Sequence, residues 1–273
     1  MIAYFTKTNI GYSHVKENKR CQDYSACYHD EERTIITACD GHGGDIYVRS
    51  HLGSKFASDA VIKVLKELER TDFYKYSKKD ICNKLRLNIL CEWNNLVEKD
   101  LVGNRISKRE VLTLSSDKCF RLGQHPERAY GTTLNAAMIF GNKLVCVSIG
   151  DGGVFLVRKG QMALAVPEDE ETVANVTYSM CQEDAYDHLK VEIYNFSDLD
   201  GVIVCTDGLI NPYQSLGNFR DKFVKPICVK MQEGKQKEIE DFIVSVGEKL
   251  GIGDDVTFGI AIKTGISIRS YRK

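Results

Sequence analysis

The stretch KLVCVSIGDGGVFLVRKGQMALAV, residues 143–166, decides the fold class. It contains three short runs rich in β-branched and apolar residues, separated by a glycine-rich turn at residues 151–153 and a second turn at residues 159–160. Turns this short connect antiparallel neighbours, whereas a parallel pair needs a crossover of a dozen or more residues. We therefore expect an antiparallel meander here, with a hairpin turn at residues 151–153.

Similar runs lie on both sides of this stretch, with amphipathic segments between them. The further β-branched runs are residues 34–41, 189–197, 201–208 and 255–262. Apolar residues spaced three and four apart predict helices within residues 44–69, 81–96 and 239–250. Residues 102–128 are polar and irregular, and we expect a loop or a short insertion there. The pattern indicates an α+β fold in which helices cover sheets.

Length and composition indicate one globular domain over residues 1–273, since 43% of the residues are hydrophobic and no linker-like segment divides the chain. The formal net charge of -1 offers no general attraction for nucleic acid or an anionic membrane, and we expect neither as a partner. Neither a signal-like start nor a run of 18 apolar residues is present, so we expect a cytoplasmic protein. The ten cysteines contain no CxxC pair and are expected to be reduced thiols, not zinc ligands.

Three of the apolar runs end in the dipeptide Asp-Gly, at Asp40, Asp151 and Asp207. Each of these alone is also a common turn signal, because both residue types tolerate positive φ. Asp40 differs because the sequence Gly-His-Gly-Gly follows it at residues 41–44. A two-residue hairpin does not need so many glycines. They suit a backbone that approaches a ligand closely, and the carbonyl of Gly41 can serve as an oxygen ligand.

Two adjacent carboxylates, Asp254 and Asp255, precede the last β-branched run. Neighbouring side chains of a strand point to opposite faces, so one of the two can enter a site while the other points away. If Asp40, Asp207 and Asp254 meet at one sheet edge, their repulsion is tolerable only with cations among them or protons on them. Oxygen ligands without histidine or cysteine favour Mg²⁺ or Mn²⁺ over zinc.

Six blocks of the sequence resemble, in order, those of the 2C-type family of metal-dependent serine/threonine protein phosphatases, in a bacterial-like form. They are CQD (21–23), ACDGHGG (38–44), YGTTL (130–134), SIGDGG (148–153), VCTDGL (204–209) and GDDVT (253–257). The resemblance implies a four-layer α-β-β-α sandwich of two antiparallel sheets flanked by helices. It also implies hydrolysis of phosphoserine and phosphothreonine in proteins, with two Mg²⁺ or Mn²⁺ ions and a metal-bridging water as nucleophile.

The same resemblance implies the ligands of the metal pair. Asp40 would bridge both ions, and the carbonyl of Gly41 would contribute a further oxygen. Asp207 and Asp254 would complete the shell of one ion, with Asp23 close by as an indirect or weak ligand.

Other positions match supporting roles in the family. Asp151 matches the site of a third, weaker metal in bacterial relatives. His42 matches the residue proposed as general acid to the leaving alkoxide, although a lone histidine in a glycine loop is equally often solvated or hydrogen-bonded without a catalytic role. Thr132 and Thr133 are expected to be structural, packing a turn beside the site.

One departure from the family concerns phosphate capture. The position five residues before Asp23, where the family usually has the arginine that grips the phosphate, holds Asn18. His14, Lys19 and Arg20 are nearby candidates, and the sequence does not choose among them. This departure leaves room for a catalytically silent relative that binds phosphoproteins, and the metal site alone also allows a phosphatase of small phosphoesters.

Three further differences lie near the predicted site. Gln22 stands where many relatives have glutamate, and Asp255 replaces a common asparagine. The segment between the second and third Asp-Gly pairs is short, so we expect a reduced flap between residues 152 and 206. Its acidic tract, residues 168–171, is expected to be a solvated loop.

Overall fold

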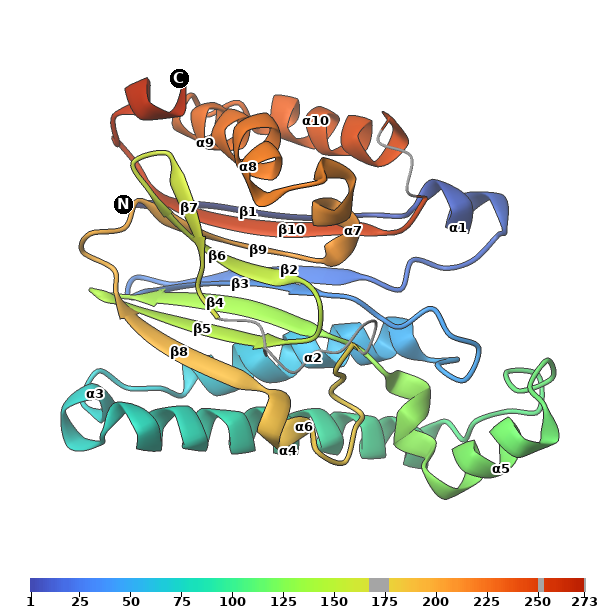
Figure 1. Cartoon of the computed structure of the whole chain (residues 1–273). Helices are drawn as coiled ribbons and strands as arrows, with labels where there is room; N and C mark the ends of the chain where they lie inside the picture. Colours follow the sequence, from blue (N-terminus) through green and yellow to red (C-terminus); the bar gives the residue numbers. More distant parts are fainter. Residues whose placement is uncertain (167–176, 250–252, 273) are drawn as a thin grey trace.

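The computed structural model describes residues 1–166, 177–249 and 253–272. Two five-stranded antiparallel sheets pack face to face, and helices cover both outer faces (Figure 1). The first sheet has the order β1 (Ile2–Asn9), β10 (Val256–Lys263), β9 (Gly201–Cys205), β6 (Gly153–Arg158) and β7 (Gln161–Leu164). The second has the order β2 (Tyr24–His29), β3 (Arg33–Cys39), β4 (Leu134–Phe140), β5 (Lys143–Ile149) and β8 (Lys190–Asn195). The expected four-layer sandwich is confirmed.

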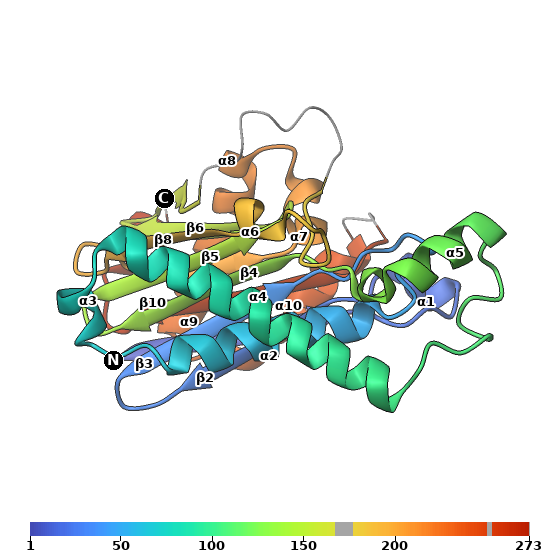
Figure 2. The same ribbon diagram turned by 90° about the horizontal axis from the view of Figure 1, so that it is seen from below.

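The helices form two separate layers. Two long helices, α2 (Ser50–Lys66) and α4 (Lys78–Gly103), cover the outer face of the second sheet (Figure 2), and α9 (Lys225–Gln232) and α10 (Gln236–Lys249) cover the first. The remaining short helices are α1 (Tyr12–Lys16), α3 (Asp72–Lys75), α5 (Ser116–Gln124), α6 (Ala185–His188), α7 (Asp207–Ile210), α8 (Leu216–Phe219), η1 (Pro126–Tyr130), η2 (Asn211–Tyr213), η3 (Arg220–Val224) and η4 (Ile268–Tyr271). Within the described residues, none of the helices is long and apolar enough to cross a membrane.

Three apolar layers hold the sandwich together, and neighbouring residues of one strand serve different layers. Ile35 of β3 packs in the layer beneath α2 and α4, whereas the next residue, Ile36, packs between the two sheets. In β9, Ile203 faces α9 and α10, and Val204 faces the other sheet. Because both faces of these strands are buried, the sequence reads as continuous apolar runs without polar alternation.

The expected meander over residues 143–166 is only half correct. β6 and β7 form a hairpin around Lys159 and Gly160, whose φ values of 49° and 74° suit a tight turn between twisted strands. β5 and β6, however, lie in different sheets, so residues 150–152 do not form a hairpin turn. Both edges of β5 are already occupied, by β4 and β8, and Gly150 (φ 102°) helps the chain cross from one sheet to the other.

Residues 102–128, expected to be an irregular loop, contain helix α5 and the 3₁₀ helix η1. The side chain of Ser115 caps α5 by accepting a hydrogen bond from the backbone N–H of Lys118. The sequence contained this Ser-Ser-Asp start signal, but the helix has only nine residues and buries a single side chain, Leu122. So short a helix has too few apolar positions to show a helical period.

Two further sequence expectations can be placed in the fold. All ten cysteines are free, and Cys39, Cys146 and Cys205 are buried, as expected for small apolar side chains. The segment 152–206 contributes β6, β7, α6, β8 and β9, and its acidic tract at 168–171 lies outside the described residues. The reduced flap therefore stays a prediction.

Candidate metal centre

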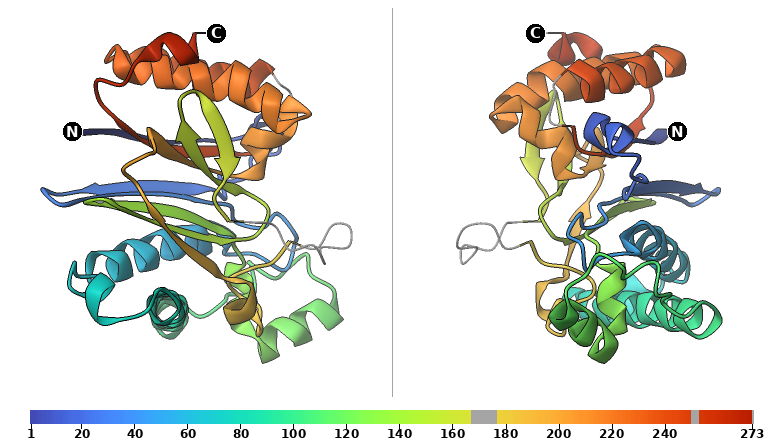
Figure 3. Two further views of the ribbon diagram at one scale, coloured as in Figure 1. Left: turned by 60° about the vertical axis from the view of Figure 1, so that its left-hand side comes forward. Right: turned by 90° about the vertical axis from the view of Figure 1, so that its right-hand side faces the viewer.

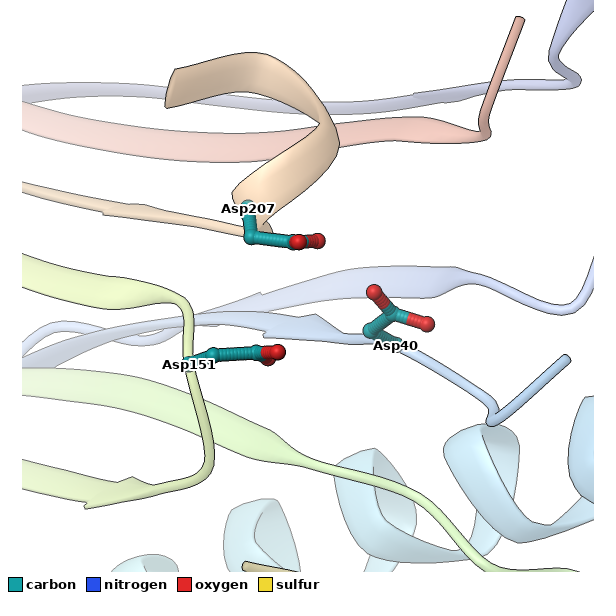
Figure 4. A group of neighbouring side chains, drawn as sticks. All are labelled: Asp40, Asp151 and Asp207. Carbon is teal, nitrogen blue, oxygen red and sulfur yellow. The ribbon is translucent and has the colours of Figure 1, made fainter. Parts of the chain in front are cut away.

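The three Asp-Gly aspartates converge at one end of the sandwich, where strands of both sheets stop. Asp40 follows β3, Asp207 follows β9 as the first residue of α7, and Asp151 lies in the crossing between β5 and β6. Their carboxylates point toward one another (Figure 4), and ligand oxygens from all three lie within 4.8 Å of each other. This separation allows one cation to be contacted by all three side chains.

The electrostatics of this group are unfavourable without a cation. Burial raises the pKa of Asp40, and the nearby carboxylates of Asp23, Asp207 and Asp254 raise it further. Burial likewise raises the pKa of Asp207, with Asp151 adding to the effect. A divalent cation placed among these oxygens would supply the missing positive charge, so the residues present fit such an ion.

Asp254 and Asp23 occupy outer positions. Asp254, just before β10, lines the same pocket, but it is exposed and is not one of the three aspartates that meet most closely. Its Oδ1 accepts a hydrogen bond of 2.8 Å from the backbone N–H of Asp255. Asp23 is buried behind the pocket, and its Oδ2 accepts a hydrogen bond of 3.0 Å from Thr206. Burial and the charge of Asp255 raise the pKa of Asp23. Its place therefore suits an indirect role.

The backbone at Asp40 is fixed by two buried threonines. The carbonyl oxygen of Asp40 accepts hydrogen bonds of 2.8 Å from the Thr132 hydroxyl and from the Thr133 N–H, and the Thr133 hydroxyl accepts one of 3.0 Å from the Asp40 N–H. Gly41 is confined as well, because a Cβ there would lie 2.5 Å from the carbonyl oxygen of Gln22. These contacts explain the glycine and the threonines as parts that hold Asp40 in place.

His42 lines the pocket between the aspartates and Tyr47, whose ring centroid lies 4.8 Å from the imidazole. Burial lowers the pKa of His42, and the charge of Asp151 opposes that shift. The histidine is thus a half-buried, titratable group beside the carboxylates, a position compatible with proton transfer.

Of the candidates for phosphate capture, only His14 lines the pocket. Asn18 is exposed and has a left-handed backbone with φ 54°, which asparagine tolerates better than most residues. The ammonium of Lys19 lies 2.6 Å from Glu17, and a guanidinium nitrogen of Arg20 lies 3.3 Å from Nε2 of His51. These two cations are used elsewhere.

Asp255 has a role that the sequence did not reveal beyond its charge. Its buried carboxylate accepts hydrogen bonds of 2.7 Å from the backbone N–H groups of Gly11 and Gln22 and lies 3.0 Å from Nδ1 of His14. An asparagine has only one side-chain oxygen, so it could not accept these hydrogen bonds on two oxygens. Asp255 therefore ties the segment that contains α1 to the start of β10.

Gln22 is also explained by its hydrogen bonds. Its Nε2 donates to the carbonyl oxygen of His42 at 3.0 Å and to the hydroxyl of Ser50 at 2.6 Å. A glutamate at this position could not donate either bond. The amide therefore joins the His42 loop to the start of α2.

The complete pocket has a volume of about 360 Å³ and an acidic lining. It is lined by Ser13, His14, Gln22, Asp40, Gly41, His42, Gly43, Asp151, Asp207, Asp254 and Asp255. Among the described residues that line it there is no lysine or arginine. Viewed toward this end of the molecule, α1 and α5 lie on opposite sides of the strand ends (Figure 3, right).

Known proteins provide an independent comparison. No curated protein matches the chain in sequence. Its fold is similar to that of Stp1 from Staphylococcus aureus, a serine/threonine phosphatase, with a TM-score of 0.63 at 16% identity over 97% of this chain and 96% of that one. A bacterial serine phosphatase gives 0.62 at 18% identity, covering 98% and 100%. The catalytic domain of the phosphatase PstP, solved with two manganese ions, gives 0.57 at 18% identity, covering 96% and 98%.

At these identities the similar structures establish the fold. The sequence itself supplies the relationship, because the model of the protein phosphatase 2C family matches residues 10–243. That match spans the first, second and third Asp-Gly aspartates and most of both sheets. With the convergent carboxylates and the shared four-layer fold, it shows that this chain belongs to the protein phosphatase 2C family, whose members are metal-dependent serine/threonine phosphatases.

Proposed function

We propose that this chain is an active phosphatase that hydrolyses phosphoserine and phosphothreonine in proteins and depends on two Mg²⁺ or Mn²⁺ ions. The observation that carries the proposal is the group of carboxylates from Asp40, Asp151 and Asp207 within 4.8 Å, in a pocket whose described lining contains no lysine or arginine. A protein that only bound phosphate would not need such an acidic pocket, since the phosphate itself is an anion. The carboxylates are useful when cations stand between them and the substrate.

In this proposal Asp40, Gly41, Asp207 and Asp254 hold the two ions, with Asp23 in support and Asp151 available to a third. When bound, the ions would lower the pKa of a water molecule for attack and stabilise the charge on the phosphoryl oxygens. The chain itself keeps the ligands in place, chiefly through the hydrogen bond that the Thr132 hydroxyl donates to the Asp40 carbonyl and the one that the Asp40 N–H donates to the Thr133 hydroxyl.

We assign proton delivery and phosphate orientation to the two pocket histidines. His42 is placed to give a proton to the leaving alkoxide of the substrate. His14, as the imidazolium, takes the part of the missing arginine, because its Nδ1–H donates to Asp255 and its Nε2–H, which has no hydrogen-bond partner among the described residues, can donate to a phosphate oxygen. Asp255 thereby orients the His14 ring.

The decisive experiment measures Mn²⁺-dependent hydrolysis of an aryl phosphate and of a phosphoserine peptide. The wild type, Asp207→Asn and the control Asp241→Asn, on the exposed side of α10, are compared. We expect the wild type and the control to hydrolyse both substrates and Asp207→Asn to lose activity. Equal rates in all three proteins, or none in any, would contradict the proposal.

A binding module without catalysis is the second candidate, favoured by Asn18 at the position where the family usually has the arginine that grips the phosphate. It predicts that the wild type retains a phosphopeptide in the presence of Mn²⁺ for hours without releasing inorganic phosphate. Phosphate release from the peptide distinguishes the two candidates.

A further inference from the structure

The acidic pocket raises the question of what attracts a negatively charged substrate to this end of the molecule. A basic projection, defined as residues 104–124 and including α5, lies at the same end of the molecule as α7, which begins with Asp207 (Figure 1). It contains five lysine or arginine residues against two acidic ones. Both acidic residues are already paired, Glu110 with Arg49 and Asp117 with Arg121. The projection therefore presents net positive charge to solvent.

Three of its cations have no partner in the part of the chain that the structure describes. The side chains of Arg105, Lys108 and Arg109 are exposed and make no hydrogen bond or ion pair within the described parts of the chain. Two large apolar side chains of the same projection are also exposed, Leu112 at 81% and Phe120 at 67%. Cations together with isolated apolar side chains form a surface suited to a peptide that contains both acidic and apolar residues.

The projection is attached firmly to the catalytic end. The guanidinium of Arg49, which is buried, donates to Glu110 at 2.6 Å and to the carbonyl oxygen of Asn104 at 2.6 Å. On α5, the ammonium of Lys118 lies 2.7 and 2.6 Å from the two carboxylate oxygens of Asp45. Asp45 follows the glycine loop that contains His42, so this ion pair joins α5 to a loop that lines the pocket.

We propose that the basic projection is the docking surface for an acidic segment of the phosphoprotein substrate, flanking the phosphorylated residue. This inference rests on the proposed function, because it assigns the substrate class of the same site. A nucleic acid fits less well, since its continuous phosphates would have to pass the carboxylates of the pocket. A peptide can place acidic residues on the projection and a single phosphate in the pocket.

The test uses a triple charge reversal, Arg105→Glu, Lys108→Glu and Arg109→Glu. Its matched control is the triple reversal Lys222→Glu, Lys237→Glu and Arg269→Glu, three exposed cations of the opposite helical layer that also have no partner among the described residues. Both variants change the net charge equally. The substrates are an aryl phosphate and two phosphoserine peptides, one with an acidic flank and one with a neutral flank.

For the projection variant we expect the KM of the acidic peptide to rise about tenfold at low salt, with kcat unchanged. The increase should shrink at 0.5 M salt, where exposed charges are screened. The neutral peptide, the aryl phosphate and the control variant should change by less than about twofold. A milder variant, Leu112→Ser with Phe120→Ser, should raise the KM of both peptides and leave the aryl phosphate unaffected.

An unchanged KM for the acidic peptide, or an equal rise in the control variant, would overturn the proposal. Loss of binding to anionic vesicles or RNA without an effect on the peptide would also overturn it, in favour of those partners. If the wild type hydrolyses no substrate, the proposed function fails. Fluorescence anisotropy with the unphosphorylated acidic peptide then still measures docking. Binding by the wild type and the control variant, and its loss in the projection variant, would support the proposal.

Discussion

Two groups of acidic residues in this molecule have opposite electrostatic surroundings. At the strand ends, Asp40 and Asp207 face other carboxylates, and their pKa values are raised. At the base of the projection, the second group, Asp100 and Glu110, lies beside the guanidinium of Arg49. Glu110 accepts hydrogen bonds from Arg49, and its pKa is lowered to about 2. The second group is balanced by a cation of the chain itself, whereas the charged neighbours of the first group are further carboxylates. The comparison teaches that an uncompensated carboxylate group marks a ligand site, while a compensated one is part of the structure.

The largest expected effect comes from Asp40→Asn, which removes one charge from the first group. We expect Mn²⁺-dependent kcat/KM to fall by roughly 10³-fold, or about 4 kcal/mol of transition-state stabilisation. When both proteins are unfolded in EDTA, the variant should unfold at a higher urea concentration than the wild type. The substitution relieves the repulsion between Asp40 and the neighbouring carboxylates. An unaltered rate, or lower stability in EDTA, would contradict the contrast between the two groups.

The second effect concerns His42, the titratable side chain beside the aspartates of the first group. The second group instead contains a permanent cation, Arg49. Loss of general-acid catalysis costs most when the leaving group is a poor one. We expect His42→Gln to reduce kcat for a phosphoserine peptide by about 10²-fold and for an aryl phosphate by less than about threefold. Equal losses on both substrates would assign His42 to a role other than proton delivery.

Removing the cation of the second group should leave its carboxylates without a compensating charge, like those of the first group. In Arg49→Met, the carboxylates of Asp100 and Glu110 lose the guanidinium that lies 3.1 and 2.6 Å from them. We expect the free energy of unfolding to fall by about 3 kcal/mol, measured by urea denaturation. A loss below about 0.5 kcal/mol would show that the ion pairs only accompany the fold.

A smaller effect is expected from Glu110→Gln, about 1.5 kcal/mol at neutral pH. The hydrogen bonds from Arg49 lower the pKa of Glu110 from 4.5 to about 2, so the ionised form stabilises the folded state. That contribution is fully present above pH 4.5 and is lost as the pH falls toward 2. The stability difference between wild type and variant should therefore disappear over this window, whereas a constant difference would contradict the pKa assignment.

The smallest effect is a pH dependence of stability whose sign is opposite to that of Glu110. Burial and like charge raise the pKa values of Asp40 and Asp207 in the protein without metal, so protonation favours the folded state. Their contribution is present below the unfolded pKa of about 4 and is lost as the pH rises through the folded values. In EDTA, the Asp40→Asn and Asp207→Asn double variant should lose less stability than the wild type as the pH rises from 5 to 7.5.

Local sequence patterns predicted the long helices α2, α4 and α10 and the described strands β3 and β5 to β10, because runs such as residues 34–39 and 201–205 are buried on both faces. They did not predict β1, β2 and β4. They failed where the outcome depended on long-range pairing. A glycine-rich turn does not reveal whether the next strand joins the same sheet, so the crossing at Asp151 was predicted as a hairpin. That crossing is what brings Asp151 to Asp40 and Asp207.

The candidate site shows the same division. Spacing and resemblance indicated the aspartates, but the hydrogen bonds of Asp255 with Gly11, His14 and Gln22 join residues more than 230 positions apart in the chain. No local rule predicts such contacts. The resemblance also pointed to Asn18, whereas the fold places that residue outside the pocket and His14 inside it.

The central claim is that the uncompensated carboxylates form a divalent metal site, and thermal unfolding with increasing Mn²⁺ tests it most directly. Binding to the folded state alone raises the melting temperature as the ion concentration exceeds the dissociation constant. We predict a large Mn²⁺-dependent rise for the wild type and for Asp241→Asn, and little or none for Asp207→Asn. An equal rise in all three proteins, or none in the wild type, would contradict the account.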